Sequence, residues 1–288
     1  MSATAAAAPG LTGPVHVTGE LLSSKRSGAY HHVTLVAPGV AERYRPGARI
    51  GLSVGGAMTD RLLRRMFAIF RTRVTGAHGG TIEIVVHAHD DQTRWLVTAP
   101  AGTPIDIVGP VGRPFALPKE PVTCVLVGDG AAAAQLFGLA DRLRERSCVA
   151  HILLGGATEA HLFGTLEARR AARTVTVTTE DGSVGIPGRP EDVLADVLTR
   201  TGAAVVYAAG PRRLLHAAAH AAEAHGAWSQ TALDWREVCG TGLCQGCVVP
   251  VVGAHGVPQW ARACTDGPVF RGDRVRWDEL ADAGTGAS

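Results

Sequence analysis

The hydrophobic pattern of the chain changes its period once, between residues 118 and 121. From residue 121 to residue 226, apolar strand-like runs alternate with helix-like runs, beginning with "PVTCVLVGDG" and "AAAAQLFGLADRLRER". Strands that alternate with helices predict a doubly wound parallel sheet, with a ligand bound at the carboxyl ends of its strands. We therefore expect an α/β domain at residues 118–228.

Residues 14–117, which precede this domain, show the two-residue period of β-strands. Short runs in which apolar and polar residues alternate are separated by turn residues at intervals typical of a small antiparallel β-barrel. The runs are "VHVTGELLSS", "HHVTLVAPG", "ARIGLSVGG", "FAIFRTRV", "TIEIVVHAH" and "TPIDIVGPVG". The fold class that follows is multidomain, with a β-barrel and then an α/β domain.

Length and charge narrow the classes of function. A chain of 288 residues fits two or three domains, and a charged fraction of 19% with a net charge of +2 argues against nucleic-acid binding. No apolar run is long enough for a membrane span, since the longest is broken by Asp129 and by glycines. Residues 1–13 lack a basic segment before an apolar one, so we interpret them as a flexible tail and expect a cytoplasmic protein.

Four cysteines near the carboxyl end have a distinctive spacing. Cys239, Cys244, Cys247 and Cys264 read C-x4-C-x2-C-x16-C, and the spacings of the first three cysteines are those of plant-type [2Fe–2S] proteins. The intervening glycines allow close approach to a cluster and allow amide groups to point at its sulfurs. A four-thiolate zinc site and unligated thiols are the alternatives. The remaining cysteines, Cys124 and Cys148, stand in or beside apolar runs and are predicted to be buried.

A glycine turn joins the first predicted strand of the α/β domain to a helix. In "LVGDGAAAAQLF", Gly128 and Gly130 precede a helix amino terminus, which is a place suited to a phosphate group. The turn is not the six-position G-x-G-x-x-G fingerprint, and such turns are common in α/β domains. The turn supports a nucleotide site only in combination with the other motifs of the chain.

The order of barrel, nucleotide domain and cysteine module resembles the ferredoxin–NADP reductase superfamily. More specifically, "CGTGLCQGC", "ACTDGPVF" and "TEDGSVGIPG", with "YAAGP" and "DIVGPVGRPF", resemble the electron-transfer subunits of class 1B dihydroorotate dehydrogenase (PyrK-type proteins). The resemblance covers nearly everything after about residue 14. It implies FAD between the barrel and the nucleotide domain, a [2Fe–2S] cluster on a module at residues 229–288, and NAD on the parallel sheet. It also implies an FMN-containing catalytic partner subunit that oxidises dihydroorotate in pyrimidine biosynthesis.

The resemblance assigns flavin-binding residues. "RRMFAIF" matches the family's flavin motif, in which Arg65, with Arg64 beside it, would pair with the FAD pyrophosphate. The other candidates in the motif are Phe67 and two departures from the family pattern. Met66 replaces a proline, and Ala68 replaces a serine or threonine whose hydroxyl usually reaches the reactive nitrogen of the flavin. An ordinary strand with basic outer positions is the alternative.

A second flavin segment is implied by "VHAHDDQTRWL". Ala88 and His89 are the backbone candidates there, and Thr93 is predicted to cap a helix whose amide groups face phosphate.

The resemblance also assigns a nicotinamide nucleotide site. Its candidates are Gly128, Gly130, Glu159, Gly210 and Pro211. The sequence departs from the family here too, with Ala134 and Gln135 in the phosphate turn and Ala209 where cysteine is frequent. Glu159, Glu180 and Asp181 are carboxylates that would repel a ribose phosphate, which favours NAD over NADP, although each is also compatible with a solvated loop.

The implied activity is electron transfer from the partner flavin to the cluster, then to FAD, then to NAD, because a flavin converts between one-electron and two-electron steps. No side chain needs to act as a catalytic acid or base. Residues 266–270 are candidates for contact with the partner or for bracing the cluster loop. The pair His216 and His220 is interpreted as a solvent-facing feature. A relative that serves another oxidoreductase or a ferredoxin-like partner, and a zinc-holding module without enzymatic activity, are the competing hypotheses.

Overall fold

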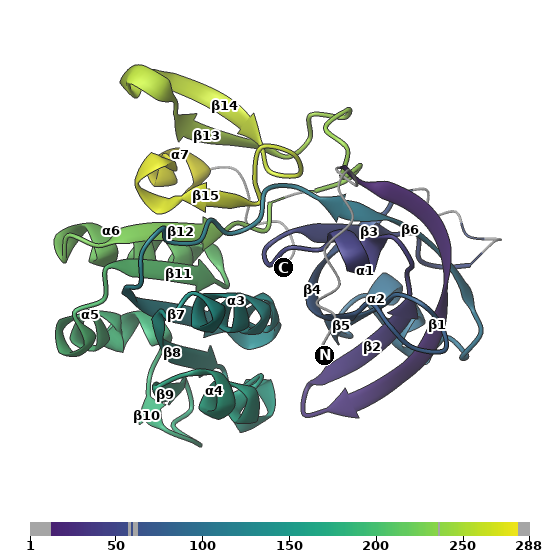
Figure 1. Cartoon of the computed structure of the whole chain (residues 1–288), viewed down its shortest axis with the longest axis horizontal. Coiled ribbons are helices and arrows are strands. Elements are labelled where there is room, and N and C mark those ends of the chain that lie inside the picture. Colours follow the sequence, from purple (N-terminus) through teal and green to yellow (C-terminus); the bar gives the residue numbers. More distant parts are fainter. Residues whose placement is uncertain (1–12, 57–58, 60–62, 236, 282–288) are drawn as a thin grey trace, which may run out of the picture.

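The computed structural model describes residues 13–56, 59, 63–235 and 237–281. The tail predicted at residues 1–13 therefore lies outside the described residues except for Gly13. The first part of the chain is a closed barrel with the strand order β1-β2-β5-β4-β3-β6 (Figure 1). Its strands are β1 (Val15–Ser27), β2 (Tyr30–Val36), β3 (Arg49–Leu52), β4 (Arg65–Arg73), β5 (Thr81–His87) and β6 (Pro104–Val111). All neighbouring strands are antiparallel, so the predicted barrel is confirmed.

The alternating residues explain why the barrel closes. Leu21, Val33, Ile50, Ile69 and Ile84 come from five different strands and are completely buried in one apolar core. Because successive residues of a strand point to opposite faces, each strand gives this core every second side chain. Two short helices lie in the connections, α1 (Val40–Arg43) and α2 (Asp91–Thr98).

The second part is a seven-stranded sheet in the order β10-β9-β8-β7-β11-β12-β15. Its strands are β7 (Thr123–Asp129), β8 (Val149–Gly156), β9 (Thr174–Thr179), β10 (Ile186–Pro187), β11 (Val205–Ala209), β12 (Trp228–Ala232) and β15 (Val269–Arg271). Only β15 is antiparallel to its neighbour, so the predicted doubly wound parallel sheet is confirmed for the other strands.

Helices cover both faces of the sheet. The helices are α3 (Ala134–Glu145), α4 (Thr165–Ala171), α5 (Pro190–Thr201) and α6 (Arg212–Ala224). Leu126 of β7 belongs to the core that α3 and α4 cover, whereas its neighbour Val127 belongs to the core that α5 and α6 cover. The α3 side also contacts the barrel, because Phe70 of β4 packs with its ring 5.9 Å from that of Phe137.

The last part of the chain is built on the edge of this sheet. β12 and β15 pair with each other, and the cysteine-bearing segment lies between them in sequence. That segment contains the hairpin β13 (Val248–Val252) and β14 (Pro258–Arg262), and α7 (Trp277–Ala281) follows β15 (Figure 1). Short 3-10 helices are η1 (Gly130–Ala133), η2 (Glu159–His161), η3 (Ala254–Gly256) and η4 (Gly272–Arg274). The predicted division after residue 228 falls at the start of β12.

The described part of the chain contains no helix that is long and apolar enough to cross a membrane.

Candidate cofactor site

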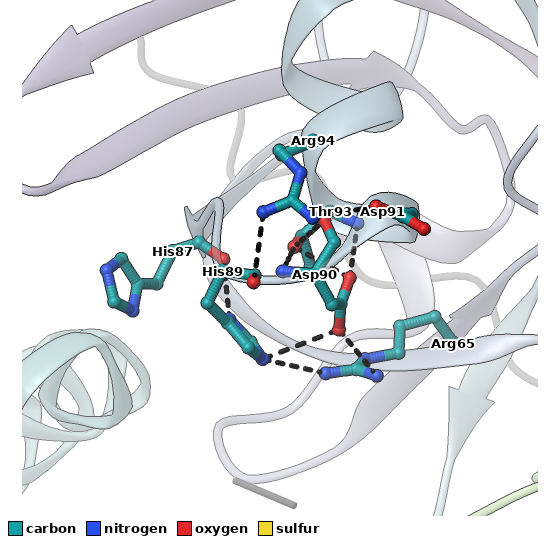
Figure 2. Close-up of polar contacts among 7 residues, drawn as sticks. All are labelled: Arg65, His87, His89, Asp90, Asp91, Thr93 and Arg94. Atoms are coloured by element: carbon teal, nitrogen blue, oxygen red, sulfur yellow. Dashed lines mark hydrogen bonds and ion pairs between the residues drawn. The ribbon is translucent and has the colours of Figure 1, made fainter.

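The start of β4 lies beside the start of α2. Nη1 of Arg65 is 3.1 Å from Oδ2 of Asp90, and Nη2 is 3.5 Å from Nε2 of His89 (Figure 2). His89 also contacts the Asp90 carboxylate at 3.4 Å. Two of the segments that the sequence assigns to flavin binding are therefore adjacent, with a partly exposed guanidinium between them.

The cap of α2 differs from the sequence-based prediction. Thr93 does not cap this helix; Asp90 does, and its Oδ1 accepts a hydrogen bond of 2.7 Å from the backbone N–H of Thr93. Thr93 is the third helical residue and its hydroxyl accepts from the Asp90 backbone N–H in return, which completes a capping box. Asp90 is the cap because it directly precedes the first turn of the helix. A carboxylate acceptor at that position also faces the positive end of the helix dipole.

The other residues of the flavin motif divide between two faces of β4. Phe67 is buried in the barrel core, and Arg64 turns to Asp106, with Nη2 at 2.6 Å from Oδ1. Met66 and Ala68 lie on the outer face, where Ala68 is half-buried. Of the two arginines, only Arg65 makes polar contacts with the second flavin segment in the part of the chain that the structure describes. In that segment, Ala88 packs at the edge of the barrel core.

A tyrosine and three histidines join the barrel to the nucleotide domain, and sequence reasoning missed this contact. The Tyr30 hydroxyl donates a hydrogen bond of 2.8 Å to the backbone carbonyl of His161. The Tyr30 ring meets the rings of His87 and His161 edge-on at 5.7 and 6.3 Å, and His89 lies 5.5 Å from His87. The histidine pair of "HAH", which begins at the last residue of β5, was the available signal, but its partner lies in another domain.

The phosphate turn after β7 is tightly packed. Gly130 has a φ of +57°, and a Cβ on it would lie 3.0 Å from the Tyr30 hydroxyl. A Cβ on Gly128 would lie 2.6 Å from the Cβ of Ala133. Gly210 and Pro211 follow β11 directly, and Pro211 stands at the amino end of α6. The strand order reverses between β7 and β11, so these residues border the crevice where such folds bind dinucleotides.

Charged side chains gather at the same crevice, and we call Asp129, Glu180, Arg189, Glu191 and Arg213 the crevice ion cluster. Arg213 lies 3.0 Å from Asp129, 3.2 Å from Glu180 and 2.9 Å from Glu191, while Arg189 lies 3.3 Å from Glu180. With three carboxylates and two guanidinium groups, the cluster has one negative charge in excess. An additional phosphate is disfavoured there.

The other predicted carboxylates lie nearby. Glu159 begins η2, and its backbone N–H donates to Oγ of Ser183 at 2.9 Å. Asp181 accepts from the same hydroxyl at 2.7 Å. Ser183 thus ties the loop after β8 to the loop after β9, whereas Glu180 alone of the three predicted acids enters the crevice ion cluster.

The cysteine loop, residues 239–247, is folded around its own thiols. Sγ of Cys239 accepts from the backbone N–H of Thr241, and Sγ of Cys244 accepts from that of Gly246, each at 3.4 Å. Positive φ angles turn the amide groups inward, at +69° for Gly240, +81° for Gly242 and +53° for Gln245.

The fourth cysteine lies outside this loop in sequence but next to it in space. Sγ of Cys264 lies 3.3 Å from Sγ of Cys247, and both thiols are buried. Burial raises the pKa of Cys264 to about 12. Burial acts in the same direction on Cys239, but hydrogen bonds from Cys244 and Thr241 outweigh it and lower its pKa to about 6. Within the described ranges, no three Cys, His, Asp or Glu side chains converge closely enough to hold a single metal ion.

Ion pairs of a buried arginine link the segment before the cysteine loop to the barrel. Arg49 of β3 has its Nη1 2.9 Å from Oδ1 of Asp234 and 3.6 Å from Oε2 of Glu237, two residues before Cys239. Desolvation raises the pKa of Glu237 to about 7 in spite of the Arg49 cation. Sequence reasoning did not identify this pair. Cys124 and Cys148 are buried in the sheet core, as predicted.

Comparison with known families agrees with this geometry. Residues 236–276 match the family described as the iron-sulfur cluster binding domain of dihydroorotate dehydrogenase B. The electron-transfer subunit of dihydroorotate dehydrogenase B (NAD(+)) from Geobacillus thermodenitrificans is 32% identical over 249 residues, which cover 85% of this chain and 92% of that protein. A homologue of that subunit from Thermotoga maritima is 32% identical over 202 residues, covering 70% of this chain and 69% of that protein.

Solved structures give the same fold. An NADH-dependent reduced ferredoxin-NADP oxidoreductase, described in connection with flavin-based electron bifurcation, superposes with a TM-score of 0.78 and 28% identity. The superposition covers 92% of this chain and 91% of that one. A ferredoxin NADP+ reductase from Neisseria gonorrhoeae with bound FAD and NADP reaches a TM-score of 0.60 at 12% identity, which supports the fold alone.

Proposed function

Since the chain belongs to the family of dihydroorotate dehydrogenase B electron-transfer subunits, we propose that it carries electrons between a partner oxidoreductase and NAD through a [2Fe–2S] cluster and FAD. In this proposal the partner is a dihydroorotate-oxidising, FMN-containing catalytic subunit. When bound, the cluster would supply one-electron transfer, FAD would couple single electrons to hydride transfer, and NAD would accept the hydride. The protein's part is to hold these groups and to orient them.

The cysteine loop fits an iron–sulfur cluster. Its inward amide groups already donate to two thiols, and its glycines leave room beside them. Cys239, Cys244, Cys247 and Cys264 would be the four ligands, in agreement with the family match at residues 236–276. A loop with this donor set suits iron–sulfur better than zinc, because three of the four thiols share one tight turn.

The barrel edge fits the pyrophosphate and ring of FAD. Arg65 is the cation, since its guanidinium is partly exposed and stands at the amino end of α2. Ala88, His89 and Thr93 are the neighbouring candidates on the second segment. Met66, Phe67 and Ala68 place no hydroxyl toward the flavin, so the ring needs its polar contacts from elsewhere.

The crevice fits NAD better than NADP. Gly128, Gly130, Gly210 and Pro211 border the space for the nucleotide, and Glu180 offers a carboxylate to ribose hydroxyls. The acidic balance of the crevice ion cluster works against a ribose phosphate.

One observation carries the proposal. Gly240 of the cysteine loop lies against Met66 of the flavin motif, so that a Cβ on Gly240 would be 2.8 Å from the Met66 sulfur. The cysteine loop and the predicted flavin strand are thus in direct contact, which would bring a cluster on that loop close enough to the flavin for electron transfer.

Anaerobic purification followed by quantification of iron, sulfide and flavin tests the cofactors. We expect near two irons and one FAD per chain, and flavin reduction by NADH in preference to NADPH. A colourless protein that contains zinc would contradict the proposal. Reconstitution with the catalytic subunit and dihydroorotate, followed by measurement of NADH formation, tests the partner.

A second function is favoured by a specific observation. The oxidoreductase of the 0.78 superposition acts with ferredoxin, and this chain lacks the hydroxyl usual at Ala68. A complex that forms with another oxidoreductase or with a ferredoxin, together with no response to dihydroorotate, would assign the chain to that alternative.

A further inference from the structure

A cavity of about 690 Å³ lies between the barrel and the α/β domain. Residues of α1 and of the end of β4 line its barrel side, and residues of α3 and α4 line the opposite side (Figure 1). None of the described residues that line it belongs to the candidate FAD, NAD or cluster sites. Its volume lies within the range of about 300–1,000 Å³ that is usual for small-molecule sites. The cavity is therefore large enough for a ligand of its own.

Arginines outnumber carboxylates in the wall of this cavity. The carboxylates among the described lining residues are Glu42, Asp141 and Glu167, and the arginines are Arg71, Arg73, Arg142, Arg144 and Arg170. Positive charge is thus in excess by two, and β4 shares it with α3 and α4 across the cavity. A concave wall with an excess of one charge attracts small ions of the opposite charge.

Two of these arginines are available to a ligand, one on each side of the cavity. Among the residues that the structure describes, the side chains of Arg73 in β4 and Arg170 in α4 have neither an ion-pair partner nor a hydrogen-bond partner. Both side chains are exposed. A guanidinium without a partner retains all its N–H donors, in a planar fork that fits a phosphate or a carboxylate.

A third arginine is held in place where the two domains meet. Nη2 of Arg71 in β4 lies 3.2 Å from Oε1 of Glu167 in α4, and the guanidinium carbon of Arg71 lies 4.2 Å from the centre of the Phe70 ring. The Phe70 ring packs edge-on against that of Phe137 in α3, at 5.9 Å. Because the ring and the carboxylate already fix this guanidinium, a ligand beside it would not need to order a mobile side chain.

A glycine in α3 leaves space in the cavity. Gly138 and Pro46 both line it, and a Cβ on Gly138 would lie 3.6 Å from Cγ of Pro46. Glycine is a poor helix former, so the sequence accepts a weaker helix at the position where a side chain would fill the cavity.

We propose that this cavity binds a small polyanion, a molecule whose phosphate or carboxylate groups pair with Arg73 on the barrel side and with Arg170 on the opposite side. Guanidinium groups bind either kind of group through two parallel hydrogen bonds. Such a ligand joins the barrel to the α/β domain and stabilises the contact between them. The site goes beyond the proposed function and does not depend on it.

Calorimetric titration of the full chain as purified, with NAD in excess, tests the site. Tripolyphosphate and citrate are the probes, one for phosphate groups and one for carboxylates. We expect at least one of them to bind with one-to-one stoichiometry and to raise the melting temperature. Arg73→Gln and Arg170→Gln should each raise Kd about tenfold, the effect of losing a charge-assisted contact. Both variants should fold, because they replace exposed side chains.

Arg200→Gln and Gly138→Met separate the cavity from general attraction between charges. Arg200 is exposed on α5 and does not line the cavity, so its loss removes the same charge and should leave Kd at the wild-type value. Gly138→Met fills the cavity and leaves every charge in place. Methionine is flexible and a good helix former, so the variant should fold and raise Kd.

Three results would overturn the site. One is wild-type protein that binds neither probe. Another is an equal weakening of binding by Arg200→Gln, which would reveal attraction by net charge alone. The third is a loss of binding confined to Arg213→Gln, which would place the probe in the crevice ion cluster.

Discussion

Arg213 and Asp129 face each other across the crevice between β7 and β11, with 3.0 Å between Nη2 and Oδ2. The same guanidinium lies 3.2 Å from Glu180 and 2.9 Å from Glu191. Asp129 and Glu191 have no cationic partner in the crevice ion cluster other than Arg213, so Arg213 supplies positive charge where a dinucleotide pyrophosphate is expected. Its loss would leave three carboxylates facing the phosphates.

Arg213→Gln should therefore weaken nucleotide binding. Loss of a charge-assisted contact of about 1.5–3 kcal/mol corresponds to an increase of the KM for NADH by roughly tenfold or more. The measurement is the rate of flavin reduction as a function of NADH concentration. Arg200→Gln, on the exposed face of α5, removes the same charge away from the crevice and should leave KM unchanged. An unchanged KM in Arg213→Gln would place the nucleotide elsewhere.

Glu180→Gln should reduce discrimination against NADPH. A carboxylate at this position repels a ribose phosphate, and its neutral replacement lowers that penalty. We expect the ratio of kcat/KM for NADH over NADPH to fall several-fold, measured by flavin reduction with each nucleotide. Asp181→Asn is the comparison, because Asp181 points to Ser183 and not to the crevice ion cluster. A change confined to Asp181→Asn would show that the wrong carboxylate had been selected.

The periodicity of the sequence was sufficient for the barrel and the doubly wound sheet, because each depends on local patterns. It was insufficient for the cap of α2. The run "HDDQT" offers Asp90, Asp91 and Thr93, and each of these residue types caps helices, so composition cannot choose among them. β15 has only three residues, too few for a strand pattern, and joins the sheet through its partner β12.

The contacts of the candidate site were less predictable than the fold. Arg213, Asp129 and Glu180 belong to three connections of the sheet, and only the strand order brings them together. Arg49 belongs to the barrel and Glu237 to the segment just before Cys239. In the sequence, neither can be distinguished from an ordinary surface charge. The cysteine spacing was visible because its residues are close in sequence.

The Asp90 carboxylate gives a prediction about acid stability. Burial acts to raise the pKa of Asp90, but hydrogen bonds from Thr93 and the Arg65 cation outweigh it and lower the pKa below its ordinary 3.8. A lowered folded-state pKa gives stability that is present above the unfolded value and is lost as the pH falls through the folded one. Asn at position 90 retains the cap but not the charge.

We therefore expect Asp90→Asn to lose less stability than wild type between about pH 5 and pH 3. Melting temperatures across this range are the measurement. Asp91→Asn, which removes an exposed carboxylate paired with Arg94, should follow the wild-type curve. Parallel curves for wild type and Asp90→Asn would contradict the lowered pKa.

Cys264→Ser should remove the cluster. Cys264 reaches Cys247 from outside the cysteine loop, and a hydroxyl is a much poorer ligand for iron than a thiolate. Iron content and the electron paramagnetic resonance signal after dithionite reduction should both fall sharply. Cys148→Ser, in the sheet core, should retain both. Unchanged iron in Cys264→Ser would disprove the four-cysteine site.

Gly240→Ala tests the contact between the cysteine loop and the flavin strand. Alanine at this position has two costs, a φ of +69° and a Cβ placed 2.8 Å from the Met66 sulfur. Gly226 has a similar φ of +66° but no atom within 4 Å of its Cβ position. Gly226→Ala therefore measures the backbone cost alone, about 1–2 kcal/mol.

Gly240→Ala should cost about 1–3 kcal/mol more than Gly226→Ala, the usual penalty for an overpacked contact. It should also lower cluster content, since the loop must move away from Met66. Adding Met66→Ala to Gly240→Ala removes the collision, and a double-mutant cycle from chemical unfolding measures the recovery. Additive losses in that cycle would mean that Gly240 and Met66 do not touch, and the observation on which the proposed electron transfer rests would be lost.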